Sequence, residues 1–146
     1  MTTLVPTDDH VRPTRLSKKP IILVADDEPL IRDLLLRYLS AHDFHPLLAR
    51  NGQEALDIYR AKGEEIALVL LDIRMPGLSG PETLTAIQAI NPRVRCCFMS
   101  GDFGVYSPEE LQARGALHLF TKPFLPRELV SVLRRLAVEE EQEALG

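Results

Sequence analysis

Several features are missing from this sequence of 146 residues, and each absence excludes a class of protein. No apolar run approaches the roughly 20 residues that a membrane-spanning helix needs. Residues 1–20 lack the apolar centre of a secretory signal. The net charge is −4 at pH 7, so the chain has no basic excess with which to bind nucleic acid. We therefore expect a cytoplasmic protein that binds neither a membrane nor nucleic acid directly.

Cysteine is scarce as well. The two cysteines, Cys96 and Cys97, are adjacent, and neither has a further Cys or His at the spacing of a metal site. On a β-strand, neighbouring side chains point to opposite faces, which makes a disulfide between these two awkward. We interpret both as small apolar residues of the core, in a reducing compartment where disulfides are rare.

The sequence does contain a regular alternation of strand and helix patterns. Hydrophobic residues make up 45% of the chain, which is ample for the core of one domain. Short apolar runs predict strands at residues 21–25, 44–49, 66–72, 94–99 and 116–120. A helical pattern follows each run, beginning near residues 29, 52, 79, 107 and 126. This alternation predicts an α/β fold, a doubly wound three-layer sandwich with helices on both faces of a five-stranded parallel sheet. In a flavodoxin-like (βα)5 sheet of this kind the strand order is 2-1-3-4-5, and we take that order as the expectation.

Local signals mark where several helices begin and end. Ser79 with Glu82, and Ser107 with Glu110, have the spacing of capping boxes. Gly63 is placed to end the second helix.

The two ends of the chain differ in composition from the segment between them. Residues 1–19 are polar and contain two prolines, Pro6 and Pro13, and residues 139–146 are acidic. We expect a flexible N-terminal tail (1–19), one domain (20–138) and an acidic C-terminal tail (139–146). The acidic tail is predicted to be either a solvated extension or a fraying helix end.

Four of the five predicted strands end in polar, potentially reactive residues. Asp26 and Asp27 follow the first strand, Asp72 ends the third, Ser100 follows the fourth and Lys122 the fifth. Strands 1, 3, 4 and 5 are neighbours in the predicted order, so these side chains meet at one edge of the sheet.

Three carboxylates at one edge repel one another and favour a bound cation. Oxygen-only ligands suit Mg²⁺, which favours one or two carboxylates together with a phosphate. The ammonium of Lys122 and the hydroxyl of Ser100 would complete a pocket for phosphoryl oxygens. The set contains no His or Cys, which argues against zinc.

Each residue taken alone has a simpler explanation. Asp26 and Asp27 precede a helix, and helix capping would account for both. Asp72 enters a stretch rich in proline and glycine, which fits a turn. A single serine or lysine after a strand carries little information. Coincidence explains their joint occurrence at successive strand ends poorly.

Four segments match a known family in their order and spacing. They are Val24-Ala25-Asp26-Asp27-Glu28-Pro29, Leu71-Asp72-Ile73-Arg74-Met75-Pro76-Gly77 with Gly80, Met99-Ser100-Gly101, and Thr121-Lys122-Pro123-Phe124. Over residues 19–138 the chain resembles the receiver domain of two-component response regulators, typified by the chemotaxis protein CheY.

The resemblance implies a role for each acidic strand end. Asp72 corresponds to the phosphoacceptor, which takes a phosphoryl group from a phosphohistidine of a sensor histidine kinase or a histidine phosphotransfer protein. Asp27 corresponds to a direct Mg²⁺ ligand and Asp26 to a ligand acting through water. Arg74 corresponds to the residue whose backbone carbonyl binds the metal.

Two further residues correspond to groups that contact the phosphoryl group. The hydroxyl of Ser100 would swing toward it, and the ammonium of Lys122 would pair with it. The family has a cis peptide bond at the position of Lys122-Pro123. Mg²⁺ and Lys122 would neutralise charge as the phosphoryl group moves in line onto Asp72. Ser100 would then differ between the two states and bias the loop and helix after the fourth strand.

One position departs from the family pattern. Three residues before the lysine, where the family usually has Tyr or Phe as a rotamer switch, this chain has Leu119. Phe120 is adjacent, but neighbouring side chains on a strand face opposite ways. We therefore expect either a weak switch or one that runs through the loop at residues 102–107.

A further hypothesis concerns Arg74 and Asp102, which lie two residues beyond Asp72 and Ser100. We expect their side chains to pair across the mouth of the site and to hinder the water that hydrolyses the acyl phosphate. An exposed ion pair adds little stability, so its effect would be on solvent access.

These observations favour a stand-alone phosphorelay receiver: a switch that assists its own phosphorylation and dephosphorylation, rather than an enzyme. Little sequence follows residue 138. Output is therefore expected through an unidentified downstream protein, a homodimer formed on phosphorylation, or onward transfer to a histidine. The resemblance places the contact surface on the fourth helix, the fifth strand and the last helix.

Two alternatives remain. One is a small Mg²⁺-dependent phosphatase that forms an aspartyl-phosphate, but Arg74 stands where such enzymes usually place a second acid. The other is a pseudo-receiver that binds partners without phosphorylation, and the full set of site residues argues against it.

Overall fold

The structure, a computed structural model, describes residues 19–145. Most of the predicted N-terminal tail, residues 1–18, therefore lies outside the described residues. The strands are β1 (Ile21–Ala25), β2 (His45–Ala49), β3 (Ile66–Asp72), β4 (Cys96–Ser100) and β5 (Ala116–Thr121). All neighbouring strands are parallel, and their order is β2-β1-β3-β4-β5. The predicted sheet is confirmed.

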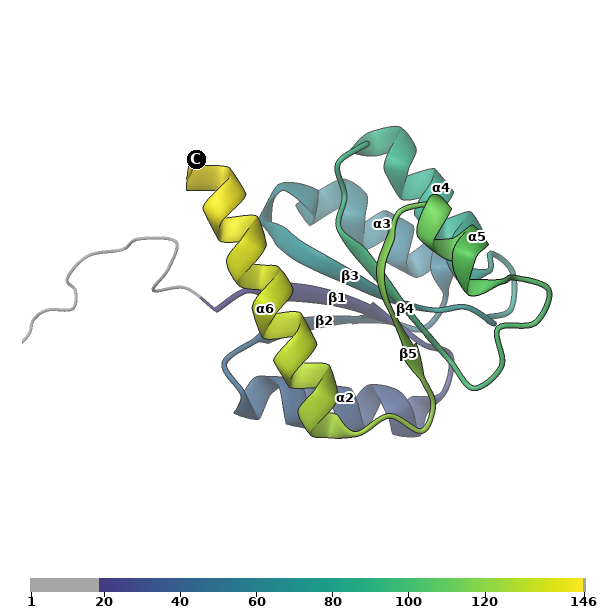
Figure 1. The fold of residues 1–146 in the computed structure, drawn as a ribbon, viewed down its shortest axis with the longest axis horizontal. Coiled ribbons are helices and arrows are strands. Elements are labelled where there is room, and N and C mark those ends of the chain that lie inside the picture. Colours follow the sequence, from purple (N-terminus) through teal and green to yellow (C-terminus); the bar gives the residue numbers. More distant parts are fainter. Residues whose placement is uncertain (1–18, 146) are drawn as a thin grey trace, which may run out of the picture.

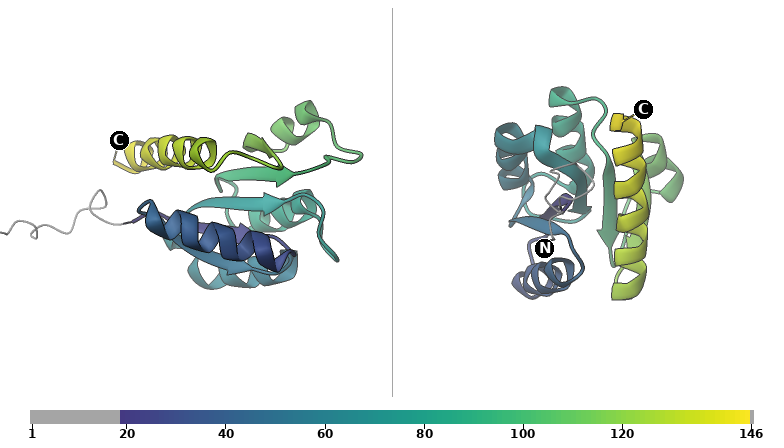
Figure 2. Two further views of the ribbon diagram at one scale, coloured as in Figure 1. Left: turned by 90° about the horizontal axis from the view of Figure 1, so that it is seen from below. Right: turned by 90° about the vertical axis from the view of Figure 1, so that its left-hand side faces the viewer.

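A helix follows each strand and packs on one face of the sheet. The helices are α2 (Pro29–Ala41), α3 (Gly52–Lys62) with a 3₁₀ turn η2 (Gly63–Glu65), α4 (Gly80–Ile90), α5 (Pro108–Ala113) and α6 (Pro126–Leu145). The two core clusters place α2 and α6 on one face and α3, α4 and α5 on the other. Figures 1 and 2 show these three layers. The doubly wound fold is therefore confirmed.

Side chains alternate along the central strands between the two halves of the core. In β1, Leu23 packs toward α3 and α4, whereas Val24 packs toward α2 and α6. Both are completely buried. A strand buried on both faces has to be apolar throughout, which is why β1 and β3 are nearly continuous hydrophobic runs. This burial fixes the strands and, with them, the residues at their carboxyl ends.

Some predicted boundaries differ from the structure, each for a local reason. Phe44 precedes β2 because its amide donates to the Leu39 carbonyl at the end of α2, at 3.1 Å. Val94 precedes β4 because its amide closes a turn on the Asn91 carbonyl, at 3.1 Å. The predicted end of the second helix near Gly63 is confirmed, because α3 ends at Lys62 and Gly63, with a right-handed φ of −53°, caps it and begins η2.

The two predicted capping boxes behave differently. At Ser79 both bonds are present, because its hydroxyl accepts from the Glu82 amide and its amide donates to the Glu82 carboxylate. Ser107 accepts from the Glu110 amide at 3.0 Å, which is one half of the motif.

The last helix, α6, runs through residues 139–145, which the sequence assigned to an acidic tail. Within the part of the chain that the structure describes, none of the helices has the length and apolar content needed to cross a bilayer.

Gly80 explains the close packing of α4 against the end of β3. A Cβ at this position would lie 2.5 Å from the Asp72 carbonyl oxygen and 2.9 Å from the Ile73 Cα. The Gly80 amide donates to the Ile73 carbonyl at 2.8 Å. Gly77 differs, because it has a φ of +79° but a Cβ added there would meet no atom within 4 Å. Lack of space therefore favours glycine at position 80, and the left-handed backbone favours glycine at position 77.

This difference gives a matched pair of substitutions. Gly80→Ala forces backbone atoms apart, so we expect it to lower the free energy of unfolding by about 1–3 kcal/mol. Gly77→Ala adds only left-handed strain and is expected to cost about 1 kcal/mol. Urea denaturation of both variants checks this. Equal losses, or a larger loss for Gly77→Ala, would contradict the steric explanation.

The cysteines lie in β4 and face opposite halves of the core, as predicted. Both thiols are free and completely buried. Burial, with a smaller contribution from the neighbouring thiol, raises the pKa of Cys96 well above its usual range. Burial also raises the pKa of Cys97 to about 12, against the smaller opposing effect of Arg95. Neither residue forms the reactive thiolate at neutral pH.

We therefore expect the folded protein to resist thiol reagents. The folded state should react with a chromogenic disulfide reagent at least about 100-fold more slowly than the same protein in concentrated urea. The absorbance change in urea should correspond to both cysteines. Rapid reaction of either thiol in buffer would show that β4 is not held in the core.

Candidate functional site

Three carboxylates meet at the carboxyl edge of the central strands. Asp72 is the last residue of β3, while Asp26 and Asp27 follow β1 directly. The parallel register pairs Ala25 with Leu71 and so brings these strand ends together. The three carboxylates each offer an oxygen atom, and these atoms lie within 4.8 Å of one another. The side chains of Asp26 and Asp72 are buried, and that of Asp27 is exposed.

The ammonium of Lys122 lies between the buried carboxylates. Its Nζ is 2.8 Å from Asp26 Oδ2 and 3.3 Å from Asp72 Oδ2. Glu28, which the sequence placed beside the site without assigning it a role, also approaches this ammonium, with Oε1 at 3.4 Å. The Lys122 amide donates to the Ser100 carbonyl at 2.8 Å, and the Lys122–Pro123 bond is cis as expected.

Burial and charge shift the pKa values of Asp72 and Lys122. Burial, followed by the nearby charge of Asp26, raises the pKa of Asp72 to about 6. Lys122 and the Arg74 amide oppose this rise. For Lys122, burial is the largest single effect and lowers the pKa, but bonds to and charges of Asp26 and Asp72 together outweigh it and raise the pKa. Lys122 therefore stays protonated, and Asp72 is mainly ionised at neutral pH.

Ser100 ends β4 next to this group, but its hydroxyl is bonded within its own loop. Ser100 Oγ donates to the Asp102 carbonyl at 2.6 Å and accepts from the Asp102 amide at 3.1 Å. The residue is 2% exposed. The hydroxyl is therefore close to the site in sequence and register, yet it is engaged by Asp102 rather than directed at Asp72.

Arg74 and Asp102 form the predicted pair at the edge of the site. Arg74 Nη1 lies 3.0 Å from Asp102 Oδ2, and both side chains are about two-thirds exposed. The pair joins the loop after β3 to the loop after β4. The Arg74 amide also donates to Asp72 Oδ1 at 3.3 Å. The loop after β3 thus contacts the central carboxylate directly.

Leu119 and Phe120 face opposite sides of β5, as expected. Phe120 is completely buried with α2 and α6, whereas Leu119 is half-buried on the side of α3, α4 and α5. Phe120 therefore does not occupy the position of the missing aromatic residue. Phe103 and Tyr106, from the loop after β4, pack on the same core cluster as Leu119. The sequence pointed to this loop without identifying Tyr106.

Comparisons with known proteins agree with the geometry. The model of the family "Response regulator receiver domain" matches residues 22–134. The chain is 37% identical over 120 residues to the transcriptional regulatory protein AruR of Pseudomonas aeruginosa. That match covers 80% of this chain and 49% of AruR, so the chain spans about half the length of this relative. It is 35% identical to sporulation initiation phosphotransferase F of Bacillus subtilis, over 70% of this chain and 82% of that protein.

Solved structures give the same result. A response regulator receiver domain protein from Clostridium thermocellum has a TM-score of 0.79 at 25% identity, covering 84% of this chain and 98% of that one. The response regulator TrrA of Thermotoga maritima, in complex with Mg²⁺ and BeF, has a TM-score of 0.70 at 33% identity, covering 80% and 98%. The fold, the clustered strand-end residues and the family match agree: this chain belongs to the response regulator receiver domain family of two-component systems.

Proposed function

We propose that this protein is a phosphorylation switch that accepts a phosphoryl group from a phosphohistidine onto Asp72. The observation that carries the proposal is the position of this carboxylate at the end of β3. It lies 3.3 Å from the Lys122 ammonium and beside two further carboxylates. Receiver domains are generally phosphoacceptors, and this geometry provides one nucleophilic oxygen surrounded by charge-neutralising groups.

The donor atoms at this edge fit Mg²⁺. Asp26, Asp27 and Asp72 supply only oxygen, the ligand type that Mg²⁺ favours, and their oxygens are close enough to share one ion. The backbone carbonyl of Arg74 is a further ligand in this proposal. When bound, Mg²⁺ would supply positive charge against the phosphoryl oxygens. The structure of TrrA with Mg²⁺ and BeF supports this assignment.

The residues of the chain would divide the transfer step between them. A carboxylate oxygen of Asp72 attacks phosphorus while the bond from the donor histidine nitrogen to phosphorus breaks, and that nitrogen retains the electron pair. The ammonium of Lys122 neutralises charge on the phosphoryl oxygens. To donate to one of these oxygens, the hydroxyl of Ser100 must first leave the Asp102 carbonyl, which it contacts at 2.6 Å.

Exposed apolar residues beside the site favour a protein as phosphodonor. Leu30, in the first turn of α2, is 83% exposed, and Leu125, after β5, is 70% exposed. Leu34 is also exposed and lies one helical turn from Tyr38, on the same face of α2. Such side chains are typical of protein contacts. We propose that a sensor histidine kinase or histidine phosphotransfer protein docks on this face of α2.

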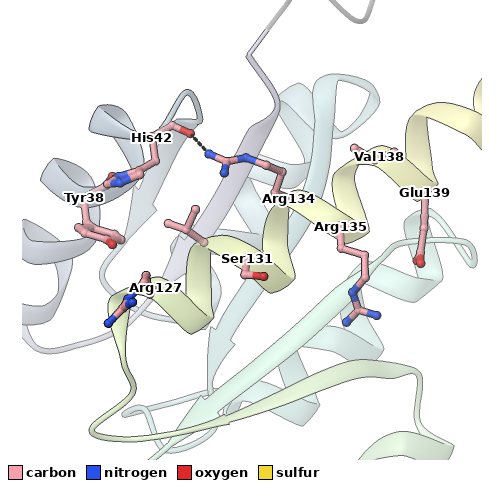
Figure 3. Close-up of a pocket in the computed structure, with 9 residues that line it drawn as sticks. Tyr38, His42, Arg127, Ser131, Arg134, Arg135, Val138 and Glu139 are labelled. Carbon is pink, nitrogen blue, oxygen red and sulfur yellow. Dashed lines mark hydrogen bonds between the residues drawn. The ribbon is translucent and has the colours of Figure 1, made fainter.

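A groove between α2 and α6 continues that surface (Figure 3). Its volume is about 590 Å³, and its lining includes Tyr38, His42, Arg127 and Arg134. The Arg134 guanidinium donates to the His42 carbonyl at 3.1 Å and so links the end of α2 to α6 beside the groove. These groups would favour an acidic donor surface.

Output is proposed to pass to a downstream protein or to a phosphorylation-dependent homodimer. The contact surface expected from the family comprises α5, β5 and α6 in this structure. Direct binding to nucleic acid or to a membrane forms no part of this proposal, and a cytoplasmic location stays a prediction.

The phosphatase alternative receives less support. Arg74 stands where such an enzyme would need a second acid, and its guanidinium is paired with Asp102 at 3.0 Å. Arginine cannot exchange a proton at neutral pH. The pseudo-receiver alternative receives less support too, because Asp26, Asp72 and Lys122 are in direct contact. A phosphoacceptor switch with slow dephosphorylation of its own accounts for more of the geometry.

Labelling by a small phosphodonor tests the acceptor. With Mg²⁺ and acetyl phosphate, the wild-type protein should gain one phosphoryl group, measured by intact-protein mass spectrometry. Asp72→Ala should reduce labelling at least about 100-fold, because the attacking oxygen is removed. Asp57→Ala, which removes an exposed carboxylate of α3, should label normally. The proposal fails if the wild type gains no label or if Asp72→Ala keeps it.

The pair of Arg74 and Asp102 is expected to slow hydrolysis of the acyl phosphate. Removing either side chain opens the site to water, so Arg74→Ala and Asp102→Ala should each dephosphorylate about two to ten times faster than the wild type. The free energy of unfolding should hardly change, because the pair is exposed.

Arg37→Ala supplies the control for this prediction. Arg37 pairs with Asp33 at 3.2 Å on the surface of α2, and both side chains are exposed. Its loss should leave the dephosphorylation rate unchanged. Decay of the labelled protein after removal of acetyl phosphate gives the rates of the wild type and of the three variants, and unchanged decay in both site variants would refute the shielding role.

A further inference from the structure

Tyr106 connects the loop after β4 to two helices. Its hydroxyl oxygen lies 3.5 Å from the hydroxyl oxygen of Ser79, the residue that caps α4. The Arg114 guanidinium, at the end of α5, lies 5.5 Å from the centre of its ring. The Tyr106 amide donates to the Phe103 carbonyl at 3.1 Å. Tyr106 is therefore held between the start of α4 and the end of α5.

The contact of Tyr106 with Ser79 matters because the loop that ends at Ser79 begins at Asp72. The loop at residues 73–79 leaves Asp72 and ends at Ser79, whose hydroxyl accepts from the Glu82 amide in the capping box. The loop at residues 101–107 leaves Ser100 and contains Tyr106. The contact between Tyr106 and Ser79 therefore joins the two loops that begin at the proposed phosphoacceptor and at its neighbouring hydroxyl.

The end of this loop nearest the site is held by different bonds. Ser100 Oγ is bonded to the carbonyl and to the amide of Asp102. Asp102 Oδ1 also accepts from the Gly104 amide at 2.8 Å. If Ser100 is to reach a phosphoryl group on Asp72, these bonds must rearrange and the loop must shift. The contact between Tyr106 and Ser79, at the other end of the loop, must either resist this shift or change with it.

Leu119 makes this contact more important. The side chain at this strand position carries no polar atom, so it cannot form a hydrogen bond to the loop. It packs, half-buried, on the same core cluster as Phe103 and Tyr106. A polar contact between this loop and α4 is instead made by Tyr106.

We propose that Tyr106 is a positioning residue that holds the loop after β4 in its unphosphorylated arrangement through Ser79, and transmits the loop's movement to α4 and α5. The proposal rests on Asp72 being the phosphoacceptor. Occupation of that site favours the state in which Ser100 leaves Asp102. The contact of Tyr106 with Ser79 favours the opposite state. Loss of the tyrosine hydroxyl therefore makes occupation of the site easier.

The first experiment uses the small number of tyrosines. The chain contains three, namely Tyr38, Tyr59 and Tyr106, so protein labelled with 3-fluorotyrosine gives three fluorine resonances that Tyr→Phe variants assign. Beryllofluoride, a phosphoryl mimic, is added with Mg²⁺. We expect the Tyr106 resonance to shift and the Tyr59 resonance to stay, because Tyr59 is buried in the core and bonded to Asn91 at 2.9 Å.

The second experiment measures how strongly the mimic binds. Tyr106→Phe keeps the ring and removes the hydroxyl, so the beryllofluoride concentration at half-saturation should fall about two- to fivefold. Tyr59→Phe removes a hydroxyl that is bonded to Asn91 in the core, outside the site, and should leave this concentration unchanged. In a Ser79→Ala background, Tyr106→Phe should cause no additional change, because the partner hydroxyl is already absent.

The outcomes separate this proposal from the proposed function. If the fluorine signal of bound beryllofluoride is absent in the wild type, Asp72 is not an acceptor and both proposals fail. If beryllofluoride binds but the Tyr106 resonance does not move, or Tyr106→Phe binds it as the wild type does, the role of Tyr106 alone is refuted. An undiminished effect of Tyr106→Phe in the Ser79→Ala background would also refute it.

Discussion

The contact of one ammonium with two buried carboxylates is the interaction on which the rest of this structure depends. Adjacent parallel strands bring Asp26 and Asp72 together, and burial disfavours the charged form of Asp72. Lys122 lies within 3.3 Å of both and offsets part of this cost. The three carboxylates and the ammonium still carry a formal excess of negative charge, which a divalent cation would neutralise. The repulsion among these carboxylates is therefore what favours metal binding there.

This arrangement requires a rigid support, and the hydrophobic core provides it. The strands that carry the two aspartates are buried on both faces, so neither can twist or slip without exposing apolar side chains. The support extends into the loops, where Gly80 allows α4 to approach the backbone of Asp72 closely. The carboxylates at the strand ends are thus held in place by the apolar packing of their strands and by the start of α4, which its capping box stabilises.

The sequence predicted the fold and most of the site because both depend on local patterns. Apolar runs give the strands, and each run ends in its own polar residue, so Asp26, Asp72 and Lys122 could be brought together from strand order alone. Contacts between loops lack such a pattern. The approach of Glu28 to Lys122 and the bonds from Ser100 to Asp102 depend on side-chain geometry.

The acceptor site and the route by which a signal leaves it therefore differ in how firmly the fold holds them. The proposed phosphoacceptor, Asp72, is a buried strand end whose position the core fixes. Transmission needs a side chain that senses Ser100 and contacts a helix, and Leu119 offers no polar atom for this purpose. Tyr106 lies in the same loop as Ser100's partner, Asp102, and reaches α4 through Ser79. In the proposed relay, Tyr106 responds to Ser100 through their shared loop, so this relay does not need an aromatic switch on β5.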